Sequence, residues 1–426
     1  MRERRARLSL VTVATLAVVV PGAAAGLAEH SSGLDAGGGP VTSWSVARQP
    51  DGSYRATLAT GDRIHSKIPT ALPATHDERA EDVQRTRVGF PGQPATNPWR
   101  LQATLPGAVI KDISFASPAV ASFARPTVGY IAAELGRVWK TTDGGNTWTR
   151  IMNLGYPYYW YGVDALSEND VVISGFDNSN WRGLLRWSHD GGQTWSSDVV
   201  LTTHGWSNRV RFADDQHGLV VNLIAQDRRD AHYTTTGGQT EADWTATTIA
   251  PWTGWWGNQF SLLPNLRARV SGIHYCDSLD GGASWSCIPF GIDEVFDGAT
   301  FFHDDLFGWV GGGSISPTVE GWVHRTADGG KTWSGRTLEA PWPIREIRFV
   351  TSNLGWAAGG NYSSGVGGLY FSKDGGQTWS LDLDAGAELD ACDHWGSVGR
   401  GQVWCAGYDS SLAGKVYTLT LPASSG

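Results

Sequence analysis

Five acidic or imidazole side chains lie in short connecting segments, where they could act as acids, bases or nucleophiles. They are Glu294, Asp297, Glu346, Asp390 and His394. Two carboxyl groups on either side of a glycosidic bond can act as general acid and as base or nucleophile, so these residues are catalytic candidates for a glycoside hydrolase. His394 and Tyr161 could act as bases in a polysaccharide lyase. The alternative for each carboxylate is a solvated or turn-capping role.

Aromatic residues are concentrated in the same connecting segments, beside amides and arginines. Aromatic rings stack on the C–H faces of sugars while polar groups bind the hydroxyls. Any one of these rings could instead fill the core, and their density in three successive segments is what favours a binding surface for a glycan or a protein. The candidate ligand-binding residues are Tyr159, Trp160, Tyr161, Trp206, Asn208, Arg209, Trp252, Trp255, Trp256, Asn258, Trp342, Arg345 and Trp395.

A repeated phrase predicts how these segments are positioned. The phrase Thr-Asp-Gly-Gly-Asn-Thr-Trp at 142–148 recurs, with small changes, about every 46 residues, which is typical of a repeat architecture. Its aspartate can accept backbone hydrogen bonds and its glycines accept positive φ, so each copy predicts a β-hairpin turn. The other copies lie at 188–195, 278–285, 326–333 and 372–379, with a degenerate copy at 235–240.

In most units, two strand-like segments precede the phrase, and the predicted hairpin supplies a third and a fourth strand. Each unit therefore has the four short antiparallel strands of a propeller blade. The expected inner strands are 110–115, 162–166, 210–212, 259–263, 299–302 and 344–349. After the sixth unit come three more strands, at 395–398, 402–407 and 415–421, and the missing fourth strand is found at 99–104. We therefore expect an all-β, seven-bladed β-propeller over residues 97–422, closed by an N-terminal strand, with 423–426 as a tail.

In such a ring, the segments that join one blade to the next converge around the central axis, so the candidate site is an axial funnel. The repeated hairpins are expected on the outer rim, as scaffold. The composition suits this fold, with 55 Gly and 22 Trp among 426 residues and only 18% charged residues. The formal net charge of −9 and the absence of a basic tract argue against a nucleic-acid partner.

The N-terminus has the pattern of a secretory signal peptide. Four arginines in the first seven residues precede an apolar run at 8–20 and the small residues Ala23 to Ala25, so we expect residues 1–25 to be removed. The apolar run of about 13 residues is short for a membrane span of ~20, so no span is expected after cleavage. The mature protein is expected to be secreted or extracytoplasmic and monomeric, by an export route that the sequence leaves open. Residues 26–96 are expected to be an extension with a small hairpin, which acts as a linker or as a flap.

The four cysteines fit an exported protein. Cys276 and Cys287 flank one predicted hairpin, and Cys392 and Cys405 flank another, which favours two local disulfides among the three connectivities that four cysteines permit. No Cys/His spacing indicates zinc, and neither a metal nor a cofactor is predicted.

The repeated phrase resembles the Asp-box, or BNR, repeat of a family of β-propellers. Asp-box sialidases carry an Arg-Ile-Pro motif, whereas this chain has Lys-Ile-Pro at 67–69 and Cys-Ile-Pro at 287–289, which disfavours a sialidase. Xyloglucan-cleaving relatives use two propellers, and this chain has residues for one. The segments 301–311 and 347–359 are most similar to the repeat consensus of the bacterial Ycf48/Hcf136-like exported propellers. That resemblance implies a seven-bladed fold and a protein partner.

Three functional hypotheses follow. The first is recognition of a glycan or protein ligand on the axial face. The second is a polysaccharide-degrading hydrolase or lyase with its active site in the same funnel. The third is a Ycf48-like assembly or scaffold factor.

Overall fold

The computed structural model describes residues 99–116, 125–223, 230–249, 256–272, 274–289, 298–314, 319–361, 365–397 and 401–421, together with six strands within the first 58 residues. The chain divides into two compact units, Met1–Arg87 and Val88–Gly426. In the first unit, β1 (Thr15–Val19), β6 (Ser53–Leu58), β5 (Trp44–Arg48) and β2 (Ala28–His30) form one sheet in that order, and β3 (Gly33–Leu34) pairs with β4 (Pro40–Val41). Strand β1 lies within the segment predicted to be the signal peptide, and β5 and β6 form the expected small hairpin.

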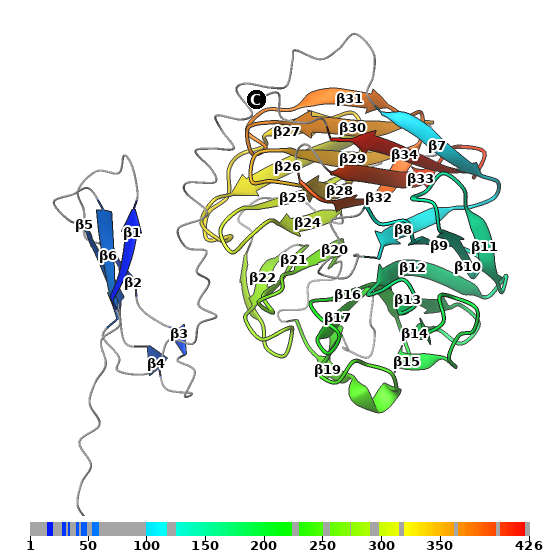
Figure 1. Ribbon diagram of the computed structural model, residues 1–426, viewed down its shortest axis with the longest axis horizontal. Coiled ribbons are helices and arrows are strands. Elements are labelled where there is room, and N and C mark those ends of the chain that lie inside the picture. The colour runs from blue at the N-terminus through cyan, green and yellow to red at the C-terminus, as the bar shows by residue number, and fades with distance from the viewer. Residues whose placement is uncertain are drawn as a thin grey trace, which may run out of the picture. The chain divides into compact units, whose positions relative to one another are not determined.

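The described residues of the second unit form seven four-stranded antiparallel sheets, arranged as the blades of a propeller (Figure 1). The predicted fold is therefore confirmed. Blades 1 to 3 consist of β8 (Ile110–Phe115), β9 (Gly129–Ala133), β10 (Arg137–Thr141) and β11 (Thr149–Asn153); β12 (Tyr158–Ala165), β13 (Val171–Asp177), β14 (Arg182–Ser188) and β15 (Val199–Thr202); and β16 (Trp206–Phe212), β17 (Gly218–Leu223), β18 (Ala231–Thr234) and β19 (Thr245–Thr247), with the 3-10 helix η1 (Glu241–Asp243) before β19.

Blades 4 to 7 continue the same pattern around the ring, and the first strand of every blade lies nearest the axis (Figure 1). Their strands are β20 (Trp256–Leu262), β21 (Ala268–Gly272), β22 (His274–Ser278) and β23 (Ser286–Pro289); β24 (Ala299–Phe302), β25 (Gly308–Ser314), β26 (Glu320–Thr326) and β27 (Leu338–Ala340); β28 (Ile344–Phe349), β29 (Gly355–Asn361), β30 (Val366–Ser372) and β31 (Ser380–Asp384); and β32 (Glu388–Trp395), β33 (Gln402–Tyr408), β34 (Gly414–Thr420) and β7 (Arg100–Leu105).

Strand β7 closes the ring, as the sequence predicted. It pairs antiparallel with β34, with Arg100 opposite Thr418 and Leu105 opposite Gly414. Trp99, just before β7, is buried, donates from Nε1 to Asp382 at 2.7 Å and packs edge-on against Trp356. One blade is thus built from both ends of the propeller, which gives the edge of β34 a partner and closes the ring.

Each intact repeat forms the predicted hairpin turn through its aspartate. In the first copy, Asp143 accepts hydrogen bonds from the Thr147 N–H at 2.9 Å and from the Thr147 and Thr141 hydroxyls. Gly144 and Gly145 have φ of 71° and 91°, which only glycine adopts readily. In the degenerate copy, Asp243 replaces the missing aspartate by accepting from the Thr240 N–H and hydroxyl.

The same turns also join neighbouring blades. The buried indoles of Trp187, Trp309 and Trp404 each donate from Nε1 to a glycine carbonyl in the turn of the next blade, at 2.8, 2.9 and 3.2 Å. Burial of such large side chains between sheets contributes to the hydrophobic stabilisation of the ring. The repeated turns are therefore occupied by structural contacts.

Both predicted disulfides are present. Cys276 on β22 bonds Cys287 directly opposite on β23, and Cys392 on β32 bonds Cys405 on β33. Each disulfide links adjacent strands of a single blade.

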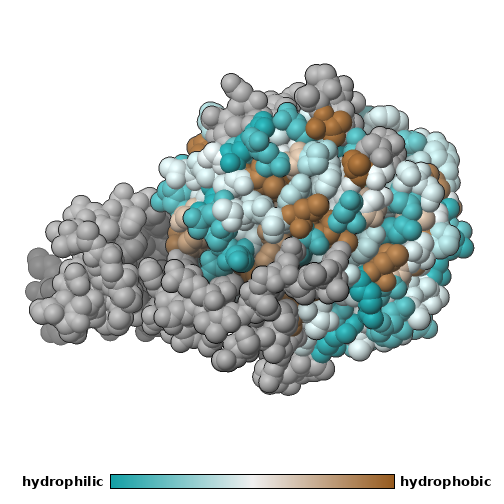
Figure 2. Space-filling model, turned by 90° about the horizontal axis from the view of Figure 1, so that it is seen from above, coloured by the Kyte–Doolittle hydropathy of each residue, from teal (hydrophilic) through white to brown (hydrophobic). Residues whose placement is uncertain are grey.

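The rim that carries β7 and β31 has a mixed surface. Figure 2 shows apolar residues there in small groups separated by polar ones. Leu101 and Leu381 are exposed side chains on these two strands. Among the residues that the structure describes, no helix has the length and apolar character needed to cross a membrane.

Candidate functional site

A cavity of about 280 Å³ opens between the inner strands of the propeller. Its lining comes from blades 1, 2, 3, 6 and 7, mostly from the N-terminal halves of their inner strands. The lining residues are Lys111, Tyr161, Asn208, Arg209, Arg345, Glu388, Asp390 and Tyr408. We refer to this space as the axial cavity.

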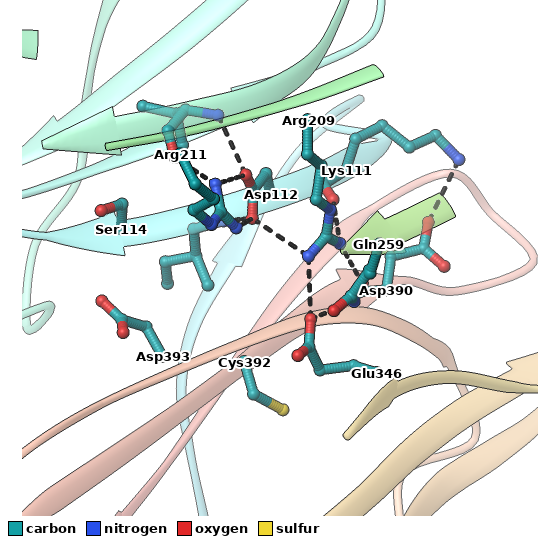
Figure 3. Close-up of polar contacts among 12 residues, drawn as sticks. Lys111, Asp112, Ser114, Arg209, Arg211, Gln259, Glu346, Asp390, Cys392 and Asp393 are labelled. Carbon is teal, nitrogen blue, oxygen red and sulfur yellow. Dashed lines mark hydrogen bonds and ion pairs between the residues drawn. The ribbon is translucent and has the colours of Figure 1, made fainter. Parts of the chain in front are cut away.

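Arg209 connects the blades at the floor of the axial cavity (Figure 3). Its Nη1 donates to Glu346 Oε2 at 2.8 Å and lies 3.5 Å from Asp112 Oδ1. Its Nη2 donates to the carbonyl oxygens of Lys111, at 3.1 Å, and Asp390, at 2.5 Å. Both charged partners are almost fully buried, so this ion pair fixes blades 1, 3, 6 and 7 around one guanidinium group.

Lys111 forms a second charged cluster at the cavity wall. Its Nζ lies 3.1 Å from Asp390 Oδ2 and 3.6 Å from Glu134, and it donates to the Tyr408 hydroxyl at 3.3 Å. Burial by itself would lower the pKa of Lys111, but the surrounding acidic groups, Asp390 first, outweigh it and raise that pKa. Lys111 therefore stays positively charged and cannot act as a neutral amine nucleophile.

Arg345 and Glu388 form the third charged pair of the lining, with Nε and Oε1 3.3 Å apart. Gln259, on β20, donates to the Arg345 carbonyl oxygen at 2.9 Å and also to Glu346. Blade 4 thus supports the cavity from below through an amide.

Three aspartates, the buried Asp112 and the half-buried Asp164 and Asp393, connect inner strands of neighbouring blades beneath the cavity. Asp112 accepts from the Val163 N–H at 2.9 Å, Asp164 from the Phe212 N–H at 2.7 Å and Asp393 from the Phe115 N–H at 2.7 Å. Arg211 binds both oxygens of Asp112 at 2.9 and 3.1 Å.

The pKa values of these three aspartates differ because their charge partners differ. Burial would raise the pKa of Asp112, but Arg209 and Arg211 outweigh burial and lower it. Burial raises the pKa of Asp164 to about 6, against the opposing effect of Arg211. Burial also raises the pKa of Asp393. Asp164 can therefore take a proton in mildly acidic solution.

The catalytic candidates fall into three groups. Asp390 lines the cavity, while Glu346 lies just beneath it with Oε2 bound to Arg209 and Oε1 3.6 Å from Arg348. His394 lies near the other end of β32, where burial together with Arg348 and His303 lowers its pKa to about 3, too low for an efficient base at neutral pH. Glu294 and Asp297 lie outside the described residues.

The candidate ligand-binding residues are also divided. Tyr161, Asn208, Arg209 and Arg345 line the axial cavity, and the neighbouring Tyr159 is half-buried. Burial raises the pKa of Tyr161 to about 12, so its hydroxyl remains protonated.

The predicted tryptophans are less available to a ligand. Trp160 is fully buried in the core between blades 1 and 2, and Trp342 is buried against Tyr370, so neither ring presents a free face. Trp395 packs partly buried against the core of blades 7 and 1, and Trp206 is half-buried. Trp252 and Trp255 lie outside the described residues, as do the side chains of Trp256 and Asn258, whose backbone belongs to β20.

Three cavity residues were not among the predicted site residues. Lys111 and Glu388 lie at the starts of inner strands, and Tyr408 ends the second strand of blade 7. The signal for Lys111 and Glu388 was present, because the first positions of an inner strand also include Arg345 and Asp390. In the described part of the chain, no group of three or more His, Cys, Asp or Glu residues could hold a metal ion.

Comparison with known proteins supports the fold. The family model described as BNR/Asp-box repeat matches residues 370–381. No curated protein matches the chain in sequence. Two solved structures are similar over most of the propeller: "YCF48 bound to D1 peptide", with a TM-score of 0.54 and 18% identity, covers 77% of this chain and 98% of its own. "YCF48 from Cyanidioschyzon merolae", with a TM-score of 0.54 and 19% identity, covers 76% of this chain and 98% of its own.

Proposed function

Since the chain is a BNR-repeat β-propeller whose fold resembles that of YCF48, we propose that it is a binding protein whose axial cavity takes a segment of another protein. The observation that carries this proposal is the charge arrangement of the cavity. Lys111, Arg209 and Arg345 face Asp390 and Glu388 across the lining, each within an ion pair or hydrogen bond of a neighbour. Such a lining offers hydrogen-bond donors and acceptors to a polar polypeptide segment. Its charged side chains are engaged with one another, which does not favour a role as catalytic acid or base.

The lining carries charges of both signs. Three cationic side chains and two carboxylates line the cavity, and Glu346, directly beneath it, pairs with Arg209. A polar segment with both donors and acceptors can therefore contact Arg345 and Glu388 together. One of the two similar structures is that of YCF48 bound to a D1 peptide, which agrees with this kind of occupant.

A protein segment fits the cavity better than a sugar, and binding fits it better than glycoside cleavage. Stacking of a pyranose requires an open aromatic face, whereas the only aromatic residues of the described lining are Tyr161 and Tyr408. Cleavage requires a carboxyl acid and a second carboxylate on opposite sides of one bond. Glu346 is held by Arg209 and Gln259, and Asp390 by Lys111.

Selection from a random peptide library tests the proposal. The propeller would be immobilised, retained peptides sequenced, and their dissociation constants measured by calorimetry. We expect enriched peptides that share a charged or polar position, bound at least tenfold more weakly by Arg345→Met. The matched control Arg150→Met removes an exposed arginine from β11 and should bind like the wild type. Failure to enrich any sequence, or equal binding to Arg345→Met, would overturn the proposal.

We further propose that the protein acts outside the cytoplasm. The leader-like segment at 1–25 and the two disulfides support this location, because disulfides persist in oxidising compartments. N-terminal sequencing of the exported protein should begin at Gly26. Retention of the whole chain inside the cell would contradict it.

A further inference from the structure

An exposed aromatic cluster lies on the same face of the propeller as the axial cavity. Trp181, in the turn between β13 and β14, is 48% exposed, and Tyr156, just before β12, is 64% exposed. Both turns lie at the N-terminal end of β12, the end from which Tyr161 faces the cavity. We call the surface formed by Tyr156, Trp181 and the half-buried Trp206 the aromatic shelf.

The Trp181 indole is held in place by its neighbours. Its ring lies nearly parallel to that of Trp206, with centroids 6.3 Å apart, and packs edge-on against the buried Phe176 at 5.7 Å. Trp181 also has a φ of 55°, a conformation that bulky residues rarely adopt. One side of the indole is thus supported by protein while the remainder faces solvent.

The turn that presents Trp181 is rigid because of one buried aspartate. Asp177 accepts hydrogen bonds from the N–H groups of Ser179 and Asn180, at 3.0 and 3.3 Å, and from the Asn180 amide at 2.7 Å. Arg182 binds the same carboxylate at 2.8 Å. The shelf is therefore formed before a ligand arrives, which reduces the ordering cost of binding.

A second contact joins the two turns of the shelf. The Asn178 N–H donates to the Pro157 carbonyl oxygen at 3.0 Å, and the Asn178 amide lies 3.5 Å from the Tyr156 hydroxyl. Two exposed rings are therefore fixed on connected turns, where consecutive units of one chain-like ligand can contact them.

We propose that the aromatic shelf binds a neutral carbohydrate chain. An exposed indole provides a flat face for the C–H groups of a pyranose, and the residues around it carry short polar groups suited to hydroxyls. The exposed neighbours are Ser179 and Asn180 in the same turn and Thr203 and His204 before Trp206.

The charge and composition of the surroundings distinguish this ligand from others. Asp177 neutralises Arg182, so the described residues of the shelf do not offer the free arginine or lysine that a nucleotide phosphate or an acidic sugar would require. Ser179, Asn180 and Thr203 are polar and exposed, and their short side chains suit the hydroxyls of a sugar. The shelf is separate from the residues that line the axial cavity, so this inference stands without the proposed peptide ligand.

Affinity electrophoresis tests the inference. The full chain would be run in native gels cast with neutral polysaccharides: xylan, laminarin, mannan, pullulan and dextran. We expect retardation by at least one of them, and at least a tenfold loss of affinity in Trp181→Ala. Trp181→Gly removes the same indole and suits the positive φ, so it should fold and lose binding equally. The control Leu279→Ala removes an exposed apolar side chain from blade 4 and should be retarded like the wild type.

Two results would overturn the inference. One is the absence of retardation in every gel, and the other is equal retardation of the wild type and Trp181→Gly. If the gels are negative while Trp181→Gly weakens binding of a selected peptide, the shelf is a protein contact rather than a carbohydrate site. Melting curves of both variants confirm that any loss belongs to the folded protein.

Discussion

Removal of either partner of the Arg209–Glu346 ion pair should strongly destabilise the propeller. Arg209 and Glu346 have side-chain exposures of only 6% and 1%, and their closest atoms are 2.8 Å apart. Breaking a buried pair from one side typically costs ~3–5 kcal/mol, because the remaining charge is left without its partner. We therefore expect Arg209→Met and Glu346→Gln each to lower the free energy of unfolding by about that amount.

The double variant separates this explanation from simple loss of contacts. With both charges removed, neither leaves the other unpaired, and Asp112 keeps Arg211 as its partner, so the cost should stay close to that of one single variant. The coupling energy is then about the size of one single effect, ~3–5 kcal/mol, at or above the top of the range seen for residues in direct contact. Arg209→Met still loses its hydrogen bonds to the Lys111 and Asp390 carbonyl oxygens, so the double variant should not recover wild-type stability.

Guanidinium-induced unfolding, followed by tryptophan fluorescence, measures these differences. The control Glu339→Gln neutralises a glutamate that is 78% exposed and should change stability by less than ~0.5 kcal/mol. Single effects that add in the double variant to within ~0.5 kcal/mol would refute the reasoning, because they would show that the two charges do not depend on each other.

Three further predictions follow from the structure. Asp143→Ala should lower the free energy of unfolding by ~1–2 kcal/mol, because the Thr147 N–H loses its acceptor, as happens when a helix loses its N-cap. An unchanged guanidinium unfolding curve would show that the turn does not depend on this contact. Burial raises the folded-state pKa of Asp164 to about 6, above its unfolded value near 4. Its contribution therefore favours folding below pH ~4, declines as the pH rises toward 6 and is constant above that. Asp164→Asn should remove this part of the pH dependence of stability, and identical profiles of stability against pH for the two proteins would contradict the prediction. Loss of the 392–405 disulfide in Cys392→Ala/Cys405→Ala should cost ~2–3 kcal/mol, measured by the shift in melting temperature, and an unshifted midpoint would show that the blade does not need it.

The fold could be predicted because its signal is local and repeated. The Asp143 turn uses contacts within seven residues, so each copy can be recognised from sequence alone and its spacing gives the blade size. The closing strand could be found because the pattern at 97–101 resembles the fourth strand of a repeat. The disulfides followed from cysteines placed symmetrically around predicted hairpins.

The site could be predicted only in part, because neighbouring residues on a strand face opposite sides. Trp160 faces the core, while the adjacent Tyr161 faces the cavity. The density of aromatic residues indicated the segment that borders the cavity, but it could not indicate which aromatic side chain faces the cavity. Trp181 could not be recognised in this way, because it is a lone tryptophan in a turn within a blade, outside the aromatic-rich connections between blades.

The closing strand also has a consequence for the order of folding. Arg100 pairs with Thr418, so one of the first strands synthesised must wait for the last one. Closing a loop of about 300 residues carries a length-dependent entropic cost of ~5 kcal/mol. The other six blades avoid this cost because their four strands are consecutive in the chain. Until the final strands are available, β7 has no partner strand and the first blade exposes the core face that blade 7 would cover. The newly made chain therefore passes through a period of vulnerability to aggregation that ends only when β34 has been synthesised.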